Sequence, residues 1–157
     1  MPSYREKLWP APWLIIATAL VIPASILVFA PLNFLVGIVV AAVLYAGCVL
    51  SLLALSPTIE ITDRELRAGR AHIPLELLGE PQAHRAQQAF AERGPRLDAR
   101  AFLVIRGWVK DVVQVPVHDP NDPTPYWLLS SRRPDAMVAA IQESRRRVGR
   151  PSGRGAN

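Results

Sequence analysis

The sequence predicts an α+β membrane protein, in which an N-terminal two-helix transmembrane hairpin precedes a small curved antiparallel β-sheet or barrel with a C-terminal helix. Three observations predict this class. Residues 8–59 contain no Asp, Glu, Lys, Arg or His. Short segments of alternating polarity follow, and this pattern is typical of half-buried strands. Apolar residues then recur at helical spacing in residues 135–147, which predicts a closing amphipathic helix.

The uncharged stretch divides into two apolar runs, at about residues 12–30 and 33–55, with Pro31 in the short turn between them. A bilayer core of about 30 Å requires roughly 20 apolar residues in a helix. The first run is slightly short and the second is long enough. Pro23 removes a backbone donor and is expected to bend the first helix. The two runs therefore predict a transmembrane helical hairpin.

Two alternatives to a hairpin are a signal peptide and a soluble helical core. A signal peptide would have a short apolar core and a small-residue cleavage site, which Pro23-Ala24-Ser25 resembles, but a second apolar run follows at once. A soluble helical core would need a polar face on at least one helix. More than fifty consecutive uncharged residues provide none.

The distribution of basic residues predicts the orientation. Arg5 and Lys7 precede the first helix, and Arg64, Arg67 and Arg70 follow the second, whereas the turn between the helices is uncharged. Lys and Arg collect on the cytoplasmic side of membrane proteins. We therefore predict a multi-pass protein of the inner (plasma) membrane with both termini in the cytoplasm.

The chain is expected to comprise a hairpin at residues 1–56, a cytoplasmic β-domain at 57–148 and a disordered basic tail at 149–157. Residues 58–143 hold eleven basic and twelve acidic side chains, so the domain as a whole is near neutral. The high isoelectric point is instead assigned to the arginine-rich C-terminus, and no nucleic-acid partner is predicted. Beside a membrane, such a tail would attract anionic lipid headgroups or reinforce the orientation.

The β-domain is predicted as a series of short elements. A helix at residues 80–94 is expected to be held by Leu77, Leu78 and Phe90, and residues 107–110 to join two strands as a hairpin turn. The strands are expected at residues 58–62, 65–69, 70–75, 101–106, 111–117 and 126–131.

Four segments resemble a known family. They are Tyr-Arg-Glu-Lys-Leu-Trp-Pro at residues 4–10, the apolar hairpin, Ile-Glu-Ile-Thr at 59–62 and Asp-Pro-Asn-Asp-Pro-Thr-Pro-Tyr-Trp at 119–127, which continues to Pro134. Together they resemble DUF3093, an actinobacterial family of small membrane proteins of unknown function, over nearly the whole chain except the tail. The resemblance implies a membrane protein and brings no known activity. The sheet closed by a C-terminal helix also resembles a pleckstrin-homology-like (PH-like) domain.

The proline-rich loop at residues 118–125 is the first candidate site. Asp119 and Asp122 are carboxylates of the kind that hold a cation, but the loop lacks the further carboxylates and the glycine of a calcium loop. Alternatively, both side chains bond local backbone amides. As a third reading, the loop contacts a protein or lipid partner, with Tyr126 and Trp127 as anchors.

Arg132 and Arg133 form the second candidate site, because they precede a helix whose N-terminus attracts anions. They are expected to hold a phosphate or lipid headgroup, or else to be a solvated pair. The histidines are scattered, and Cys48 is the single cysteine. No catalytic, cofactor or metal-binding residues are predicted.

Three functions remain open. The first is a non-catalytic membrane-anchored module that binds a protein partner or lipid. The second is an accessory subunit of a larger transport or envelope-synthesis complex, which uses the face shared by Gly37 and Ala41 as a lateral contact. The third is a membrane-surface enzyme that acts on a lipid-linked phosphate through His118, Asp119, Asp122 and Arg132.

Overall fold

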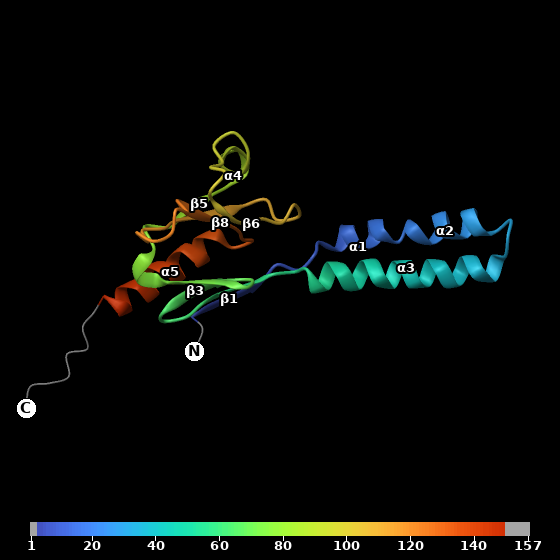
Figure 1. Cartoon of the computed structure of the whole chain (residues 1–157), viewed down its shortest axis with the longest axis horizontal. Helices are drawn as coiled ribbons and strands as arrows, with labels where there is room; N and C mark the ends of the chain where they lie inside the picture. The colour runs from blue at the N-terminus through green and yellow to red at the C-terminus, as the bar shows by residue number, and fades with distance from the viewer. Residues whose placement is uncertain (1–2, 150–157) are drawn as a thin grey trace, which may run out of the picture. The chain divides into compact units, whose positions relative to one another are not determined.

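The computed structural model describes residues 3–149, so the predicted tail from Arg150 onward lies outside the described residues. The chain divides into two compact units, Trp9–Ser56 and the segments on either side of it (Figure 1). We call the second unit the folded unit.

The unit Trp9–Ser56 is a helical hairpin of α1 (Pro12–Thr18), α2 (Val21–Phe29) and α3 (Phe34–Ala54). The first predicted helix is interrupted between α1 and α2, four residues before Pro23. The ring of a proline disfavours a regular turn there, because it crowds the carbonyl four residues earlier. Asn33 caps α3, since its Oδ1 accepts hydrogen bonds from the amides of Leu35 at 2.9 Å and Val36 at 3.3 Å.

Close packing in the hairpin is concentrated near its tip. A Cβ added at Gly37 would lie 3.3 Å from the Cα of Ile26 and from the Cβ of Phe29. Ala41 is 2% exposed. The face shared by Gly37 and Ala41 is therefore used inside the hairpin, and the prediction that it forms a lateral contact with another protein is wrong.

The first sheet of the folded unit is antiparallel, in the order β1-β2-β3-β4. Its strands are β1 (Tyr4–Lys7), β2 (Thr58–Ile61), β3 (Glu65–Ala68) and β4 (Ala71–Pro74). The three strands after the hairpin confirm the strands predicted at residues 58–62, 65–69 and 70–75. The first strand was not predicted: residues 4–7 were assigned to the hairpin domain, yet Lys7 pairs with Thr58 and Tyr4 with Ile61. Both ends of the hairpin are thus joined to adjacent strands of one ladder.

The second sheet has the order β5-β7-β8-β6. It contains β5 (Gln82–His84), β6 (Phe102–Val104), β7 (Val112–Pro116) and β8 (Tyr126–Ser130). The predicted hairpin of β6 and β7 is wrong, because β8 lies between them and pairs parallel with β6. The predicted helix at residues 80–94 is shorter, with β5 preceding α4 (Ala86–Arg93). Phe90 is 70% exposed and does not hold α4 to the core.

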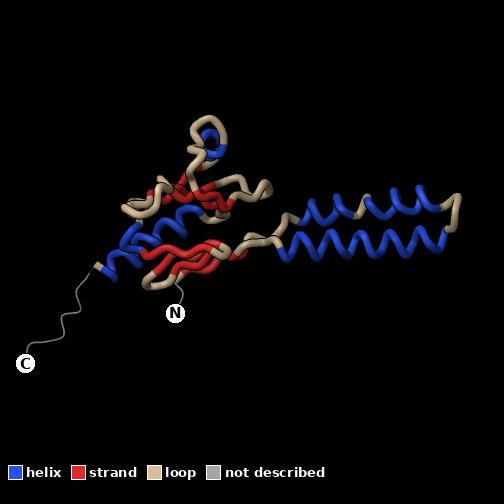
Figure 2. The backbone as a smooth tube through the Cα atoms, in the orientation of Figure 1, coloured by secondary structure: helices blue, strands red, loops and turns tan. Residues whose placement is uncertain are grey.

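The C-terminal helix α5 (Pro134–Val148) contacts β2 of the first sheet and both β5 and β7 of the second. Figure 2 shows it between the two sheets. Met137 and Ile141 on its inner face are fully buried. The main core thus lies around α5, between the sheets, and the predicted closing helix is confirmed.

Candidate functional site

The candidate site is a hydrogen-bonded junction between β1 and the segment that joins β8 to α5. In β1, Tyr4 and Glu6 point inward while Arg5 and Lys7 are exposed. Glu6 is only 7% exposed. Burial of a carboxylate is costly unless its oxygens accept hydrogen bonds, so the partners of Glu6 define the junction.

Both oxygens of Glu6 are engaged. Oε2 accepts hydrogen bonds from the hydroxyl of Tyr4 at 2.6 Å and from that of Ser131 at 2.7 Å. Oε1 accepts one from the backbone amide of Arg132 at 2.8 Å. The Glu6 carboxylate therefore accepts hydrogen bonds from three donors. Two of them, Ser131 and Arg132, belong to the segment that joins β8 to α5.

The phenol of Tyr4 is held in its protonated form. Burial and the hydrogen bond to Glu6 raise its pKa to about 12. The guanidinium carbon of Arg133 lies 5.5 Å from the centre of the Tyr4 ring, a distance that allows a cation–π interaction. One member of the predicted arginine pair thus covers the junction.

Serine hydroxyls extend the network. Ser131 Oγ also accepts a hydrogen bond from the amide of Arg133 at 3.0 Å. Ser144 of α5, which is fully buried, lies 3.0 Å from the hydroxyl of Ser3. Ser130 Oγ accepts a hydrogen bond from the amide of Arg106 at 3.0 Å. Polar groups at the end of β8 thereby fix β1, α5 and the loop before β7.

The two aspartates of the predicted loop do not belong to this junction. Asp119 Oδ1 accepts the amide of Asn121, and Asp122 Oδ1 the amide of Thr124, both at 2.9 Å. Hydrogen bonds from the side chain and from the backbone amide of Thr124 lower the pKa of Asp122. These are the local backbone contacts that one of the alternative readings expects.

Tyr126 and Trp127 are core residues, 9% and 5% exposed. The hydroxyl of Tyr126 accepts the amide of Asp98 at 2.8 Å. Trp127 packs against Phe102 with the ring centroids 4.5 Å apart and the ring planes tilted by 43°. Their interpretation as exposed anchors for a partner does not fit this burial, since β8 is covered on both faces. The signal that was misread is the unbroken apolar run of a strand covered on both faces.

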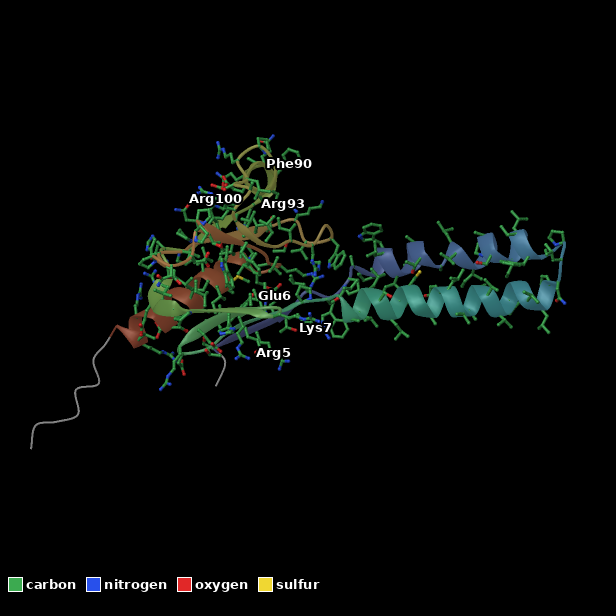
Figure 3. All side chains as sticks on the ribbon, in the orientation of Figure 1. Arg5, Glu6, Lys7, Phe90, Arg93 and Arg100 are labelled. Carbon is green, nitrogen blue, oxygen red and sulfur yellow. The ribbon has the colours of Figure 1, made fainter. Side chains whose placement is uncertain are left out.

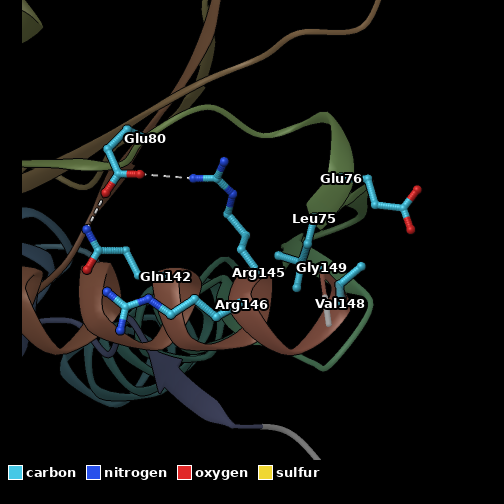
Figure 4. A pocket seen from close by; sticks show the side chains of 8 residues that line it. All are labelled: Leu75, Glu76, Glu80, Gln142, Arg145, Arg146, Val148 and Gly149. Carbon is cyan, nitrogen blue, oxygen red and sulfur yellow. Dashed lines mark hydrogen bonds and ion pairs between the residues drawn. The ribbon is translucent and has the colours of Figure 1, made fainter. Parts of the chain in front are cut away.

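A shallow groove of about 390 Å³ lies beside the C-terminal end of α5. Figure 4 shows Arg145 and Gln142 reaching toward Glu80 on the opposite wall. Arg145 Nη1 lies 3.1 Å from Glu80 Oε2, and it also donates to the carbonyl of Gly79 at 2.9 Å. Arg145 and Glu80, two of the charged side chains that line the groove, therefore bind each other and attach α5 to the segment before β5.

Among residues 3–149, no group of three or more His, Cys, Asp or Glu side chains lies close enough to hold a metal ion. The amide of His118 donates to the carbonyl of Leu77 at 2.7 Å. The junction residue that the sequence reasoning missed is Glu6. Its signal was the alternation of residues 4–7 opposite an equally alternating strand at 58–61.

Fold and junction together define a class of protein: an apolar helical hairpin inserted between the first two strands of a two-sheet α+β unit. A family model described as a protein of unknown function, DUF3093, matches residues 3–141. The chain therefore belongs to the DUF3093 family. No curated protein and no solved structure matches it. Two of the strings that carry the resemblance, at residues 4–10 and 119–134, meet at Glu6 and Ser131.

Proposed function

We propose that this protein is a non-catalytic integral membrane protein, whose hairpin anchors a cytoplasmic PH-like module that binds a protein partner or lipid headgroups. The observation that carries the proposal is the exposed apolar surface of the hairpin. Its helices present large apolar side chains outward: Ile16, Leu20, Leu27, Leu35 and Leu50 are each 65–77% exposed. In water this surface would be unfavourable by about 25 cal/mol per Å², whereas in lipid it is solvated.

Two other kinds of helix meet the same criteria of length and apolarity. The first is the core helix of a soluble protein, which is mostly buried. The spans Pro12–Phe29 and Phe34–Ala54 have only 6% and 11% of their most apolar windows buried. This exposure favours a membrane span over a core helix.

The second is a cleaved signal sequence. Cleavage within the hairpin would remove β1, expose the edge of β2 and deprive Ser131 and Arg132 of the Glu6 carboxylate. Buried donors without acceptors are costly. The pairing of β1 with β2 therefore favours a retained anchor.

The ladder also supports a topology. Because Lys7 pairs with Thr58, the two ends of the hairpin leave one sheet side by side, as expected when both helices enter the bilayer from the same side. The basic flanks, with Arg5 before the hairpin and Arg64 after it, favour the cytoplasmic side. Two four-stranded sheets around a C-terminal helix support the PH-like comparison.

Topology is tested with single cysteines in a Cys48→Ser background, in cells of a bacterial host. Asn33→Cys, at the hairpin tip, should react with a membrane-impermeant maleimide added outside. Arg5→Cys should react only after the membrane is permeabilised. The protein should also resist extraction by alkaline carbonate. Release by carbonate, or labelling of both positions from one side, would overturn the proposal.

A second candidate, an accessory subunit of a larger membrane complex, is favoured by a groove on the hairpin. Leu14 of α1 and Leu44, Gly47 and Leu52 of α3 line an apolar hollow of about 610 Å³. A Cβ at Gly47 would meet nothing within 4 Å, so this groove has room for a helix of another subunit. Gly47→Leu should then reduce co-purification of that subunit from native membranes. Unchanged recovery would count against this candidate.

A further inference from the structure

The segment between β5 and β7, residues 85–110, contains the edge strand β6 of the second sheet, and its other residues pack on the outer face of that sheet. We call it the α4 segment. Its apolar side chains cover a second small core on that face, built from Val112, Tyr126 and Leu128. The side chains that cover it are Ala89, Leu97, Ala101 and Ile105. The side chains of the segment that face the sheet are therefore buried in this second core.

The α4 segment is held in place by Arg93. Its Nε donates to the carbonyl of Ala89 and its Nη1 to the carbonyl of Val109, each at 3.2 Å. The second bond ties α4 to the loop that precedes β7. These hydrogen bonds fix the backbone from which the exposed side chains of the α4 segment project.

Charge is concentrated in this segment. Residues 85–110 contain six basic and two acidic side chains, whereas the remaining residues of the folded unit, 3–8 and 57–84 with 111–149, contain ten basic and eleven acidic ones. The near neutrality of the domain is an average over a basic segment and a balanced remainder. The excess positive charge of the folded unit lies in the α4 segment.

Each of the two acids in the segment pairs with an arginine, and in each pair the acid is less exposed than the arginine. Glu92 is 8% exposed and pairs with Arg96, whose side chain is 69% exposed. Asp98 pairs with Arg100, at 33% and 67% exposure. Lys110 is exposed as well. In both pairs the arginine is the more exposed partner, so the surface of the segment presents mainly positive charge.

Apolar side chains are exposed among these cations. Phe90 is 70% and Leu103 43% exposed. Leu103 pairs with Leu128 in the sheet, so it lies on the same face as the second core that α4 covers. Figure 3 shows Phe90, Arg93 and Arg100 gathered around α4. Single exposed apolar residues are common; an exposed aromatic ring beside several exposed cations is typical of a surface that contacts lipid headgroups.

We infer that the α4 segment binds the anionic headgroup surface of the bilayer, with Phe90 entering the interface and Arg96, Arg100 and Lys110 meeting lipid phosphates. This inference rests on the proposed membrane anchor and identifies its ligand as lipid. Charge complementarity selects an anionic surface. The proposed anchor tethers the folded unit to the bilayer surface, because the connectors at residues 8–11 and 55–57 span at most about 14 Å.

The experiment uses the full chain in liposomes, with Cys48→Ser and a fluorophore at Gln87→Cys, an exposed position on α4 that leaves Phe90 intact. A nitroxide on the lipid headgroup quenches a fluorophore that reaches the interface. Liposomes of phosphatidylcholine are compared with liposomes that also contain phosphatidylglycerol. Carbonate resistance of the same samples reports hairpin insertion independently.

We expect quenching to rise in the anionic liposomes and to return to the phosphatidylcholine level in Phe90→Ser. Arg100→Gln with Lys110→Gln should lower the ratio of bound to free segment by roughly thirtyfold. The matched control, Arg64→Gln with Arg67→Gln, removes the same charge elsewhere and should leave quenching unchanged. An equal loss in the control pair would overturn the inference by reducing the effect to net charge.

Inserted protein whose quenching does not depend on anionic lipid would also overturn the inference while leaving the anchor intact. So would a native protein partner that protects position 87 from labelling in place of lipid. Protein that fails to insert would overturn both the inference and the proposed function.

Discussion

The carboxylate of Glu6 accepts a hydrogen bond of 2.7 Å from the hydroxyl of Ser131, a residue 125 positions later in the chain. The whole hairpin and most of the folded unit separate them in sequence. Through this contact the strand that enters the hairpin is fixed to the segment that starts α5. The apolar hairpin is therefore continuous with two adjacent strands of the folded unit, and the first of these strands is fixed by a buried polar junction.

Replacement of Glu6 should destabilise the folded unit. Glu6→Ala leaves the buried donors of Tyr4 and Ser131 and the Arg132 amide without an acceptor, and we expect a loss of about 3 kcal/mol. Glu6→Gln keeps one acceptor oxygen and should cost less. The control Arg5→Gln changes an exposed neighbour and should stay within about 0.5 kcal/mol. Thermal unfolding in detergent gives the order, and equal melting of Glu6→Ala and the control would contradict it.

Tyr4 should make stability depend on alkaline pH. Its pKa is raised to about 12 in the folded protein from an ordinary value of 10, so between these values the unfolded state binds fewer protons than the folded state. Stability from this group is fully present below pH 10 and is lost as the pH rises toward 12, by about 1 kcal/mol per pH unit. Denaturant unfolding of the wild type and Tyr4→Phe at several pH values isolates this contribution. Parallel pH profiles would contradict the prediction.

The elements that sequence could predict are those with a local signal. The uncharged run at residues 8–59 defines the apolar hairpin, because a single ionisable group would have interrupted it. The alternation of residues 58–61 and the helical spacing of Met137 and Ile141 define β2 and α5 by burial of one face.

The elements that sequence could not predict depend on distant pairing. β1 contains three charged residues in four, and its inward Glu6 is acceptable only because Ser131 and Arg132 supply donors. β6 and β7 looked like a hairpin because a short turn separates them, yet β8 provides the better partner for both. Phe90 follows the buried Ala89 and was expected inside, but α4 has only one narrow apolar stripe.

The Asp-Pro loop provides a test at a single amide. Thr124 lies between Pro123 and Pro125, neither of which has an N–H, so it supplies the one exchangeable backbone amide of that tripeptide. Asp122→Ala removes the Oδ1 acceptor and should speed hydrogen exchange at Thr124. Asp122→Asn keeps an acceptor oxygen and should preserve protection. Acidification should weaken protection in the wild type only, because protonation of Asp122 weakens the carboxylate acceptor, whose pKa is lowered by hydrogen bonds from the side chain and the amide of Thr124. Residue-resolved NMR hydrogen exchange measures the Thr124 rate in the wild type and in both variants. Equal rates in all three proteins would contradict a capping role for Asp122.

Two glycines of α3 should respond differently to the same substitution. Gly37→Leu places a side chain where a Cβ already meets α2 at 3.3 Å, and it should destabilise the hairpin by about 1–3 kcal/mol. Gly47→Leu extends into open space and should leave hairpin stability nearly unchanged. Unfolding of the helices in mixed micelles, followed by circular dichroism, compares them. A larger loss at Gly47 would contradict the packing of the hairpin.

Deletion of residues 3–8 should separate membrane insertion from folding. The two apolar helices remain, so insertion should be retained. The folded unit, however, loses β1, and with it the strand that covers β2 and the carboxylate that fixes α5 through Ser131. Limited proteolysis should therefore cut the residues after the hairpin rapidly in the deletion, at a protease concentration that the wild type resists. A control that keeps the strand and changes only its exposed side chains, Arg5→Thr with Lys7→Thr, should resist cleavage as the wild type does. A resistant deletion would mean that residues 57–149 fold without the first strand.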